Sequence, residues 1–348
     1  MSTLDPEVTP ADTPAERLTD GSAGGSAGGL AGGLAGASAG GLTEALVGSA
    51  DGLDPELSPV EAEAGAELPS TSGLIAVTGS TGQLGSRIAR RLAEAGAAQR
   101  LVVRDPARAP ELEGAQVAQA SYGDIAALLN ALDGVQTLLM VSASESADRV
   151  SLHKATIDAA VAAGVRRIVY TSFVGAAPNA TFTFARDHWH TEQHLRATGV
   201  DFTFLRDNMY LDFVPGFAGE DGVIRGPAGD GRVAAVLRDD VADVAAQVLL
   251  DATHSGQTYD LTGPAAFTLA EAAAMMSEAW GRPIRYEAET LDEAYRSRES
   301  FGAPAWEVAG WVTSYAAIAS GELSEVSSAV EDITGHPPTG LAEYLARG

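Results

Sequence analysis

Short runs of consecutive apolar residues alternate along this chain with longer segments in which apolar residues recur every three or four positions. The first such pair is the run at 74–78 and the helical spacing over 83–95. A run that is apolar throughout is typical of a strand covered on both faces, and the wider spacing is typical of a helix packed on it. The alternation therefore predicts an α/β fold, with helices on both faces of a parallel sheet.

The same pattern predicts the individual elements. Gly164 and Gly199 each follow a helical segment, where a C-cap glycine is expected. Beyond the last strand the chain is expected to be mostly helical, with an alanine-rich helix around 269–280. The predicted strands are 74–78, 100–103, 116–120, 137–141, 167–171, 201–205 and 257–261, and the predicted helices before residue 251 are 83–95, 125–132, 150–163, 186–198 and 240–250.

Residues 1–72 have a different composition. They contain Arg17 as their only basic residue against a dozen acids, a tract of Gly, Ala and Ser, and no aromatic residue. Such a segment cannot bury enough apolar surface to offset the entropy lost on ordering. We therefore expect a disordered tail over 1–72, a doubly wound domain over 73–215, and a smaller lobe over 216–348 that returns a helix and a strand to the sheet.

Composition excludes several classes of function. The formal net charge of −25 opposes binding to nucleic acid, which needs clustered Lys and Arg. The absence of cysteine excludes disulfides, thiolate catalysis and Cys-ligated metals. No apolar run approaches the roughly 20 residues that span a bilayer, and no basic and apolar leader opens the chain. A soluble cytoplasmic protein without a membrane partner is expected.

Three glycines spaced three apart separate the first strand from the first helix, in Thr78-Gly79-Ser-Thr-Gly82-Gln-Leu-Gly85. Backbone N–H groups at a helix N-terminus can bind the pyrophosphate of a dinucleotide. Gly79 would make the tight turn, Gly82 would admit the phosphates, and Gly85 would let the helix pack closely on the strand. The spacing predicts a dinucleotide site; the alternative is a glycine turn in an α/β fold without a ligand.

The residue after the second strand indicates which dinucleotide binds. An acidic residue there meets the 2′-hydroxyl of NAD, whereas arginine suits a 2′-phosphate. Arg104 occupies this position and Arg108 lies one turn further, although the adjacent Asp105 could meet a ribose hydroxyl. We therefore predict NADPH rather than NADH; the alternative is that both arginines are solvated surface residues.

Several motifs, in their order along the chain, resemble the NmrA-like group of atypical short-chain dehydrogenases, and within it the NADPH:quinone reductase branch. They are the glycine turn, Val103-Arg104-Asp-Pro, Tyr122-Gly-Asp124, Ile168-Val-Tyr-Thr-Ser172, Arg206-Asp-Asn-Met-Tyr210 and the terminal Thr334-Gly-His-Pro-Pro-Thr-Gly-Leu. The resemblance covers about 73–348 and implies a Rossmann-type fold with a C-terminal substrate lobe.

The resemblance also implies which residues contact the cofactor. Arg104 would hold the 2′-phosphate, and Asp124 would lie near the adenine unless it caps the helix that follows it. The remaining implied contacts are the turn residues Gly79, Ser80, Thr81, Gly82, Gln83 and Leu84, and the residues Ser142, Ala143 and Ser144 after the fourth strand.

The chain departs from the short-chain dehydrogenase pattern at the catalytic pair. On the helix after the fifth strand, His188 and Glu192 stand where most of these enzymes have Tyr and Lys. The i, i+4 spacing places both on one helix face, so Glu192 is expected to raise the pKa of His188. His188 is thus a candidate proton donor, or else a structural residue beside the pocket.

Three histidines and a glutamate within one helix also raise the question of a metal. His190 and His194 have the spacing of helical zinc ligands, but the His-Glu-x-x-His order is absent and His188 points to a different face from His190. We expect no metal site.

The substrate pocket is expected where the fifth and sixth strands end. Phe173 and Tyr210, with Met209, would suit a flat aromatic substrate, and Asn208 could donate a hydrogen bond to a quinone oxygen; Ser172 leaves the fifth strand at the same edge. The alternative is that the aromatic residues pack between the lobes.

These inferences favour an NADPH-dependent oxidoreductase acting on a quinone-like small molecule. A quinone tolerates the lost Tyr and Lys, because the phenolate formed by hydride addition can take its proton from water. Two other classes fit less well: an NADP(H)-sensing regulator without turnover, and an epimerase-like enzyme, which the missing Tyr disfavours.

Overall fold

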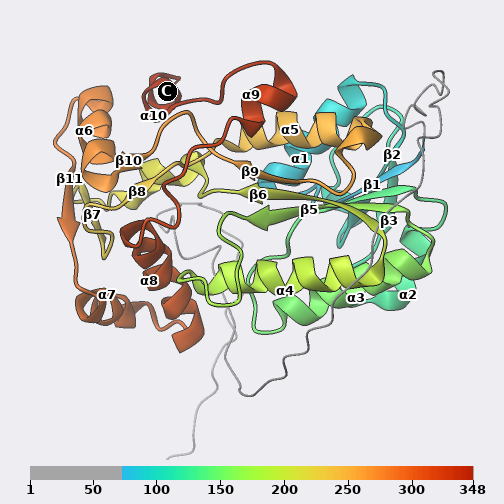
Figure 1. Cartoon of the computed structure of the whole chain (residues 1–348), viewed down its shortest axis with the longest axis horizontal. Coiled ribbons are helices and arrows are strands. Elements are labelled where there is room, and N and C mark those ends of the chain that lie inside the picture. Colours follow the sequence, from blue (N-terminus) through green and yellow to red (C-terminus); the bar gives the residue numbers. More distant parts are fainter. Residues whose placement is uncertain (1–72, 348) are drawn as a thin grey trace, which may run out of the picture.

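The computed structural model describes residues 73–347, so the expected disordered tail over 1–72 lies outside the described residues. A seven-stranded sheet forms the centre of the molecule, in the order β3-β2-β1-β4-β5-β6-β9 (Figure 1). Every neighbouring pair in it is parallel. This is the doubly wound, Rossmann-type arrangement that the alternating pattern and the family resemblance predicted.

The strands of this sheet and the helices that connect them lie within a few residues of the predicted positions. The strands are β1 (Ile75–Thr78), β2 (Gln99–Val103), β3 (Gln116–Gln119), β4 (Thr137–Met140), β5 (Arg167–Phe173), β6 (Asp201–Asp207) and β9 (Thr258–Leu261). The helices are α1 (Gln83–Glu94), α2 (Ile125–Ala131), α3 (Arg149–Ala162), α4 (Thr183–Thr198) and α5 (Arg238–Leu250), with short 3₁₀ turns at Pro106–Arg108, Leu211–Phe217 and Ala252–His254.

Two layers of helices cover the sheet. Helices α1 and α5 lie on one face with α9 (Ala329–Thr334), and α2, α3 and α4 lie on the other (Figure 1). Successive strand residues serve opposite faces: Ile75 and Val77 pack under α1 and α5, whereas Ala76 packs toward α3 and α4. Burial on both faces explains why the central strands β1 and β4 are mostly apolar.

Four short strands of the C-terminal lobe were missed from the sequence. They form two small sheets: β7 (Val223–Gly226) pairs in parallel with β11 (Arg285–Ala288), and β8 (Arg232–Val233) pairs antiparallel with β10 (Phe267–Thr268). Strand β11 reads Arg-Tyr-Glu-Ala and is mostly exposed, so no apolar run marks it. The remaining helices are α6 (Leu269–Trp280), α7 (Leu291–Arg298), α8 (Ala305–Ala319) and α10 (Leu341–Ala346), with a 3₁₀ turn at Glu299–Phe301.

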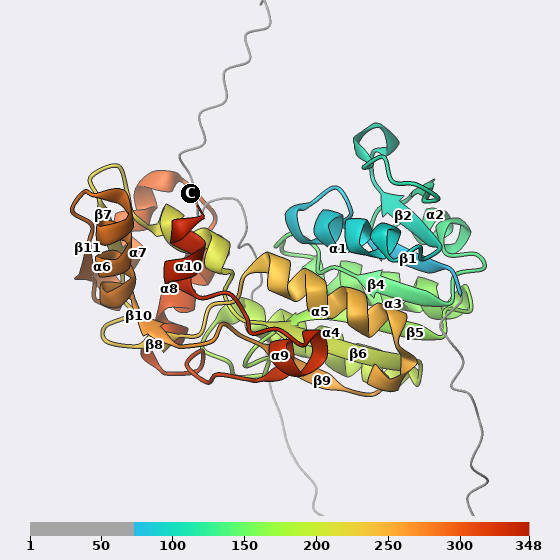
Figure 2. The same cartoon turned by 90° about the horizontal axis from the view of Figure 1, so that it is seen from above.

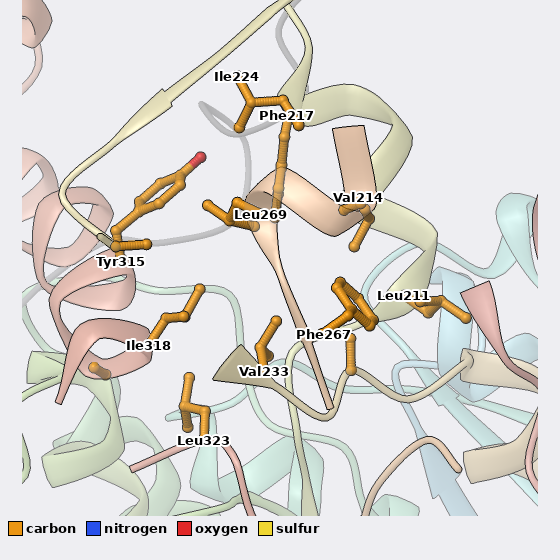
Figure 3. Close-up of a cluster of buried hydrophobic side chains, with 14 of the residues drawn as sticks. Leu211, Val214, Phe217, Ile224, Val233, Phe267, Leu269, Tyr315, Ile318 and Leu323 are labelled. Atoms are coloured by element: carbon orange, nitrogen blue, oxygen red, sulfur yellow. The ribbon is translucent and has the colours of Figure 1, made fainter. Parts of the chain in front are cut away.

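An apolar cluster joins this lobe to the sheet domain. Phe217, Ile224, Phe267 and Ile318 converge on it from the 3₁₀ turn, the small sheets and α8 (Figure 3). Phe184, in the first turn of α4, belongs to the same cluster. The lobe lies beyond the carboxyl ends of β5 and β6 (Figure 2), and its core packs around the start of α4.

Helix α1 packs unusually close to the glycine turn. A Cβ built on Gly85 would lie 2.3 Å from the carbonyl oxygen of Gly79 and 2.6 Å from its carbon. Because both atoms belong to the backbone, no side chain can move aside. Gly85 therefore permits the close packing of helix on strand that its spacing predicted.

We predict that Gly85→Ala lowers the free energy of unfolding by about 1–3 kcal/mol, the usual cost of overpacking. The higher helix propensity of Ala, worth about 1 kcal/mol, acts in the opposite direction, so the clash must exceed it. Urea denaturation measures the change, with Ser86→Ala as the neighbouring control. A Gly85→Ala protein as stable as the parent would show that α1 can move away without loss.

Candidate nucleotide-binding and active site

The strand order reverses between β1 and β4, and the loops after these two strands form the sides of a crevice. Strands β2 and β3 extend the sheet from β1 in one direction, and β5, β6 and β9 extend it from β4 in the other. Ligands of open α/β sheets bind outside the carboxyl ends of the strands at such a reversal. The glycine turn over 79–82 lies on one side, and the loop over 141–148 on the other.

The glycine turn is built to receive an anion. Gly79 adopts φ +65°, and the Gly82 N–H closes the turn by donating to the Gly79 carbonyl over 2.8 Å. Helix α1 has no side-chain cap and no acidic residue in its first turn, so its first N–H groups remain available. Within the described chain, the buried hydroxyl of Ser80 also has no hydrogen-bond partner. These features fit a phosphate group.

A cleft of about 890 Å³ opens at this turn and is lined by several cations. Arg87 and Arg91 are paired with Asp239 and Asp243 of α5. In contrast, Arg90 and Arg108 form no salt bridge within residues 73–347. The lining residues are Ser80, Thr81, Gly82, Gln83, Ser86, Arg87, Arg90, Arg91, Glu94, Arg108, Pro110, Asp239 and Asp243.

Two predicted cofactor residues lie at the rim of the sheet. Arg104 is exposed immediately after β2 and is outside the residues that line the cleft, which Arg108 reaches. Asp124 is exposed and caps α2, accepting a hydrogen bond from Ala127 N–H over 3.0 Å. Its capping role is therefore observed, and its contact with adenine stays a prediction.

His188 is buried in a polar network on the α3–α4 side of the sheet. Its Nδ1 lies 2.9 Å from the Tyr170 hydroxyl and its Nε2 lies 3.3 Å from Nη2 of Arg149. Arginine only donates, so Nε2 must accept and the single ring proton lies on Nδ1. Burial and the nearby Arg149 charge lower the pKa of His188 well below its usual 6.5. His188 is therefore neutral near pH 7.

The expectation that Glu192 raises the pKa of His188 is wrong. Glu192 is fully buried, and both of its oxygens accept hydrogen bonds from Arg206, over 2.8 and 2.7 Å. Ser172 donates a further hydrogen bond to it over 2.6 Å. The carboxylate is thus neutralised by Arg206 and is not paired with the histidine one turn away.

Most of the predicted substrate residues already use their polar groups in contacts within the protein. The Ser172 hydroxyl is buried against Glu192, and the buried Asn208 amide donates to Leu323 O and accepts from Met209 N–H. Tyr210 donates to Asp207 over 2.6 Å, and its ring lies under the Arg238 guanidinium. Phe173 is half-buried, with its ring 6.1 Å from that of His188.

Comparison with known proteins decides the family. The model of the NmrA-like family matches residues 71–344. The chain belongs to the NmrA-like family. Quinone oxidoreductase 2 of Escherichia coli is 38% identical over 281 residues, covering 78% of this chain and 98% of that protein. The NAD(P)H azoreductase of Xenophilus azovorans is 34% identical over 276 residues, covering 78% and 96%.

A solved structure supports the same assignment. The NADPH-dependent quinone oxidoreductase QOR2 of Escherichia coli, complexed with NADPH, superposes with a TM-score of 0.73 at 36% identity and covers 78% of this chain and 99% of that one. The family and branch predicted from the motifs are confirmed. In the described part of this NmrA-like chain, no helix is long and apolar enough to cross a membrane.

The helical histidines do not form part of a group of three or more potential metal ligands in the described part of the chain. His194 pairs with Asp158 of α3 over 2.7 Å, and His190 is exposed. Among residues 73–347 no group of three or more His, Asp or Glu side chains could hold a metal ion.

Sequence reasoning missed four buried residues of this NmrA-like site: Arg149, His153, Tyr170 and Asp207. Arg149 and His153 lie on α3 and belong to no recognisable motif. Tyr170 continues the apolar run of β5, so the sequence does not distinguish it from a core residue. Asp207 directly follows Arg206, and burial raises its pKa to about 7. The one sequence signal for this polar network is the occurrence of charged residues at positions that the helical and strand patterns predict to be buried.

Because His188 is neutral in the folded protein, its contribution to the free energy of unfolding depends on pH. As the pH falls through about 6.5, His188 takes up a proton in the unfolded chain but not in the folded protein, so His188 makes stability fall as the pH falls. Asp187 and Asp207 act in the opposite sense, because their folded pKa values are raised to about 6 and about 7. The difference in stability between the parent and a variant that lacks only His188 therefore isolates the contribution of this histidine.

We predict that between pH 7.5 and 5.5 the parent protein loses about 1.4 kcal/mol of stability relative to His188→Asn, which cannot protonate. Chemical denaturation of both proteins at each pH measures this. An unchanged difference would mean that His188 has the same pKa in the folded and the unfolded protein, and a gain of stability by the parent would mean that His188 is charged when folded.

Proposed function

We propose that this NmrA-like protein transfers a hydride from NADPH to a quinone-like acceptor. The observation that carries the proposal is the glycine turn at the strand-order reversal, which opens into an arginine-lined cleft in a chain otherwise strongly acidic. Relatives named as a quinone oxidoreductase and an azoreductase support an NAD(P)H-dependent oxidoreductase. A cytoplasmic location is part of the proposal and rests on the sequence alone.

The residues present fit NADPH. Gly79 to Leu84 would hold the pyrophosphate on backbone N–H groups, and Arg104 with Arg108 would meet the 2′-phosphate. Bound there, the cofactor supplies a hydride, which is two electrons and one proton, to the acceptor. Ser142, Ala143 and Ser144 would lie along its other half, and Asp124 near its adenine.

The polar network favours an acceptor that needs no acid from the protein. His188 is neutral and donates its one ring N–H as a hydrogen bond to the Tyr170 hydroxyl, while Glu192 accepts hydrogen bonds from Arg206. Neither can replace a tyrosine activated by lysine. A quinone reduced by hydride becomes a hydroquinone anion, which is stabilised by its ring and takes a second proton from water. Phe173 and Tyr210 would contact its ring, and Ser172 and Asn208 would shape the pocket floor.

Turnover separates the enzyme from a sensor. Steady oxidation of NADPH by simple quinones, with hydroquinone formed in equal amount, is expected from the purified protein. An azo dye offered in parallel tests the wider acceptor class. Tight NADPH binding without turnover of either class would support an NADP(H)-sensing regulator.

We predict that Arg104→Ala weakens NADPH binding by about 1–3 kcal/mol, the range for a charge-assisted hydrogen bond, and changes NADH binding little. Calorimetry with both nucleotides measures this, with Arg108→Ala in parallel. Arg166→Ala is the matched control, because this exposed arginine directly precedes β5, at the amino ends of the strands and away from the glycine turn. Equal weakening of both nucleotides by Arg104→Ala would make Arg104 structural.

We further predict that His188→Asn keeps quinone turnover within tenfold of the parent. Asn is preferred to Phe because its amide can replace the donor at Nδ1, whereas Phe would remove the contacts of His188 with the Tyr170 hydroxyl and with Nη2 of Arg149. Loss of an acid normally costs about 10²–10⁴ in rate. Near-abolished turnover in a folded, NADPH-binding His188→Asn protein would identify His188 as the catalytic acid.

A further inference from the structure

Three consecutive N–H groups of the loop after β4 donate to side chains from three different elements. Val141 N–H donates to Thr78 of β1 over 3.0 Å, and Ser142 N–H donates to Thr171 of β5 over 2.8 Å. Ala143 N–H donates to Nε2 of His153 on α3 over 2.9 Å. The backbone N–H groups of a surface loop usually donate to water. Here they donate to side chains of the protein, which fixes the backbone of 141–143 against the sheet.

The peptide groups of Ala143 are held from both sides. While His153 accepts from its N–H, Nε of Arg149 donates to its carbonyl over 2.9 Å. Both residues lie on the first two turns of α3, and both side chains are almost fully buried. The helix thus reaches back to hold the loop that leads into it.

The hydrogen-bond pattern requires His153 to be neutral. Its Nε2 accepts, so its proton lies on Nδ1 and is donated to Thr191 over 3.0 Å, while the Thr191 hydroxyl donates to Asp187 O. Burial and Arg149 keep the pKa of His153 well below 6.5. Tyr122, Tyr170, Asp187 and Glu145 surround the same region.

One backbone acceptor in the clamped segment has no partner. Tyr122 donates to Val141 O over 2.5 Å and Arg149 donates to Ala143 O, but the Ser142 carbonyl receives no hydrogen bond from any described residue. It belongs to the loop that borders the crevice on the β4 side.

We propose that His153 and Arg149 are positioning residues, which clamp the Ala143 peptide so that the loop holds a fixed surface, the Ser142 carbonyl included, against the nicotinamide half of the cofactor. The inference rests on the proposed function. If the 2′-phosphate binds at β2 and the pyrophosphate at the β1 turn, the other half of NADPH would extend toward β4 and β5, where this loop lies.

The test combines amide exchange with nucleotide binding. His153→Leu removes the acceptor, and we expect Ala143 N–H exchange to become at least tenfold faster by NMR. The Kd values for NADPH and NADH should both rise about five- to thirtyfold, because the two nucleotides share the nicotinamide half. This distinguishes the clamp from Arg104, whose loss affects NADPH alone.

Two further variants separate positioning from general damage. His153→Gln keeps an acceptor for Ala143 N–H and should restore both readouts to within threefold. His194→Leu, the matched control, breaks another histidine contact between α3 and α4, that with Asp158, and should move neither. Should His153→Leu not fold, the nearly isosteric Thr171→Val removes the acceptor of Ser142 N–H and should give the same shared loss of affinity.

The outcomes are distinguishable. A wild-type protein that binds neither nucleotide would mean that the proposed function fails, and this inference with it. A wild-type protein that binds NADPH, together with a folded His153→Leu or Thr171→Val variant that binds it equally well, would overturn the clamp alone.

Discussion

The hydroxyl of Thr78 joins the two sides of the crevice, and the geometry of the site depends on it. It donates to Leu139 O over 3.1 Å, accepts from Val141 N–H and lies 2.5 Å from the Tyr122 hydroxyl. Thr78 ends β1 one residue before the glycine turn, so the same residue sets the positions of the turn and of the loop after β4. A buried hydroxyl with this many partners restricts both backbones at once, because leaving any partner unsatisfied is costly.

The charge of Arg149 imposes the second constraint. Its guanidinium is buried, and Nη1 lies 3.7 Å from the Asp187 carboxylate without a hydrogen bond. Burial disfavours the charged form of His153 and His188, and this incompletely paired cation disfavours a further positive charge beside it, so both rings stay neutral. Each neutral ring has one donor and one acceptor, and the network uses both. The electrostatics of the pocket wall thus decide the hydrogen-bond directions that hold the loop.

The sequence predicted the parts of the fold whose signal is local. Central strands such as β1 and β4 could be located because each is an apolar run buried on both faces, whereas the mostly exposed edge strands β3 and β9 follow from the alternation of strands and helices. Gly79 and Gly85 could be assigned because a turn and a close packing require glycine. The network could not be predicted, because it depends on which long-range partners meet. Glu192 lies one turn from His188 on a shared face, yet it binds Arg206 of β6. The periodicity of a helix predicts which residues share a face, but it does not predict which charged residue of another element faces them.

These contacts explain how a short-chain dehydrogenase framework can lose its Tyr and Lys and still retain an ordered site. Lysine in that frame would meet Arg206 at close range, whereas Glu192 joins α4 to β5 through Ser172 and to β6 through Arg206. The helix that carries proton transfer in most relatives of this superfamily here serves as a brace between two strands at the edge of the pocket. A framework braced in this way is compatible with the acceptor proposed above, whose reduced form is already a stable anion.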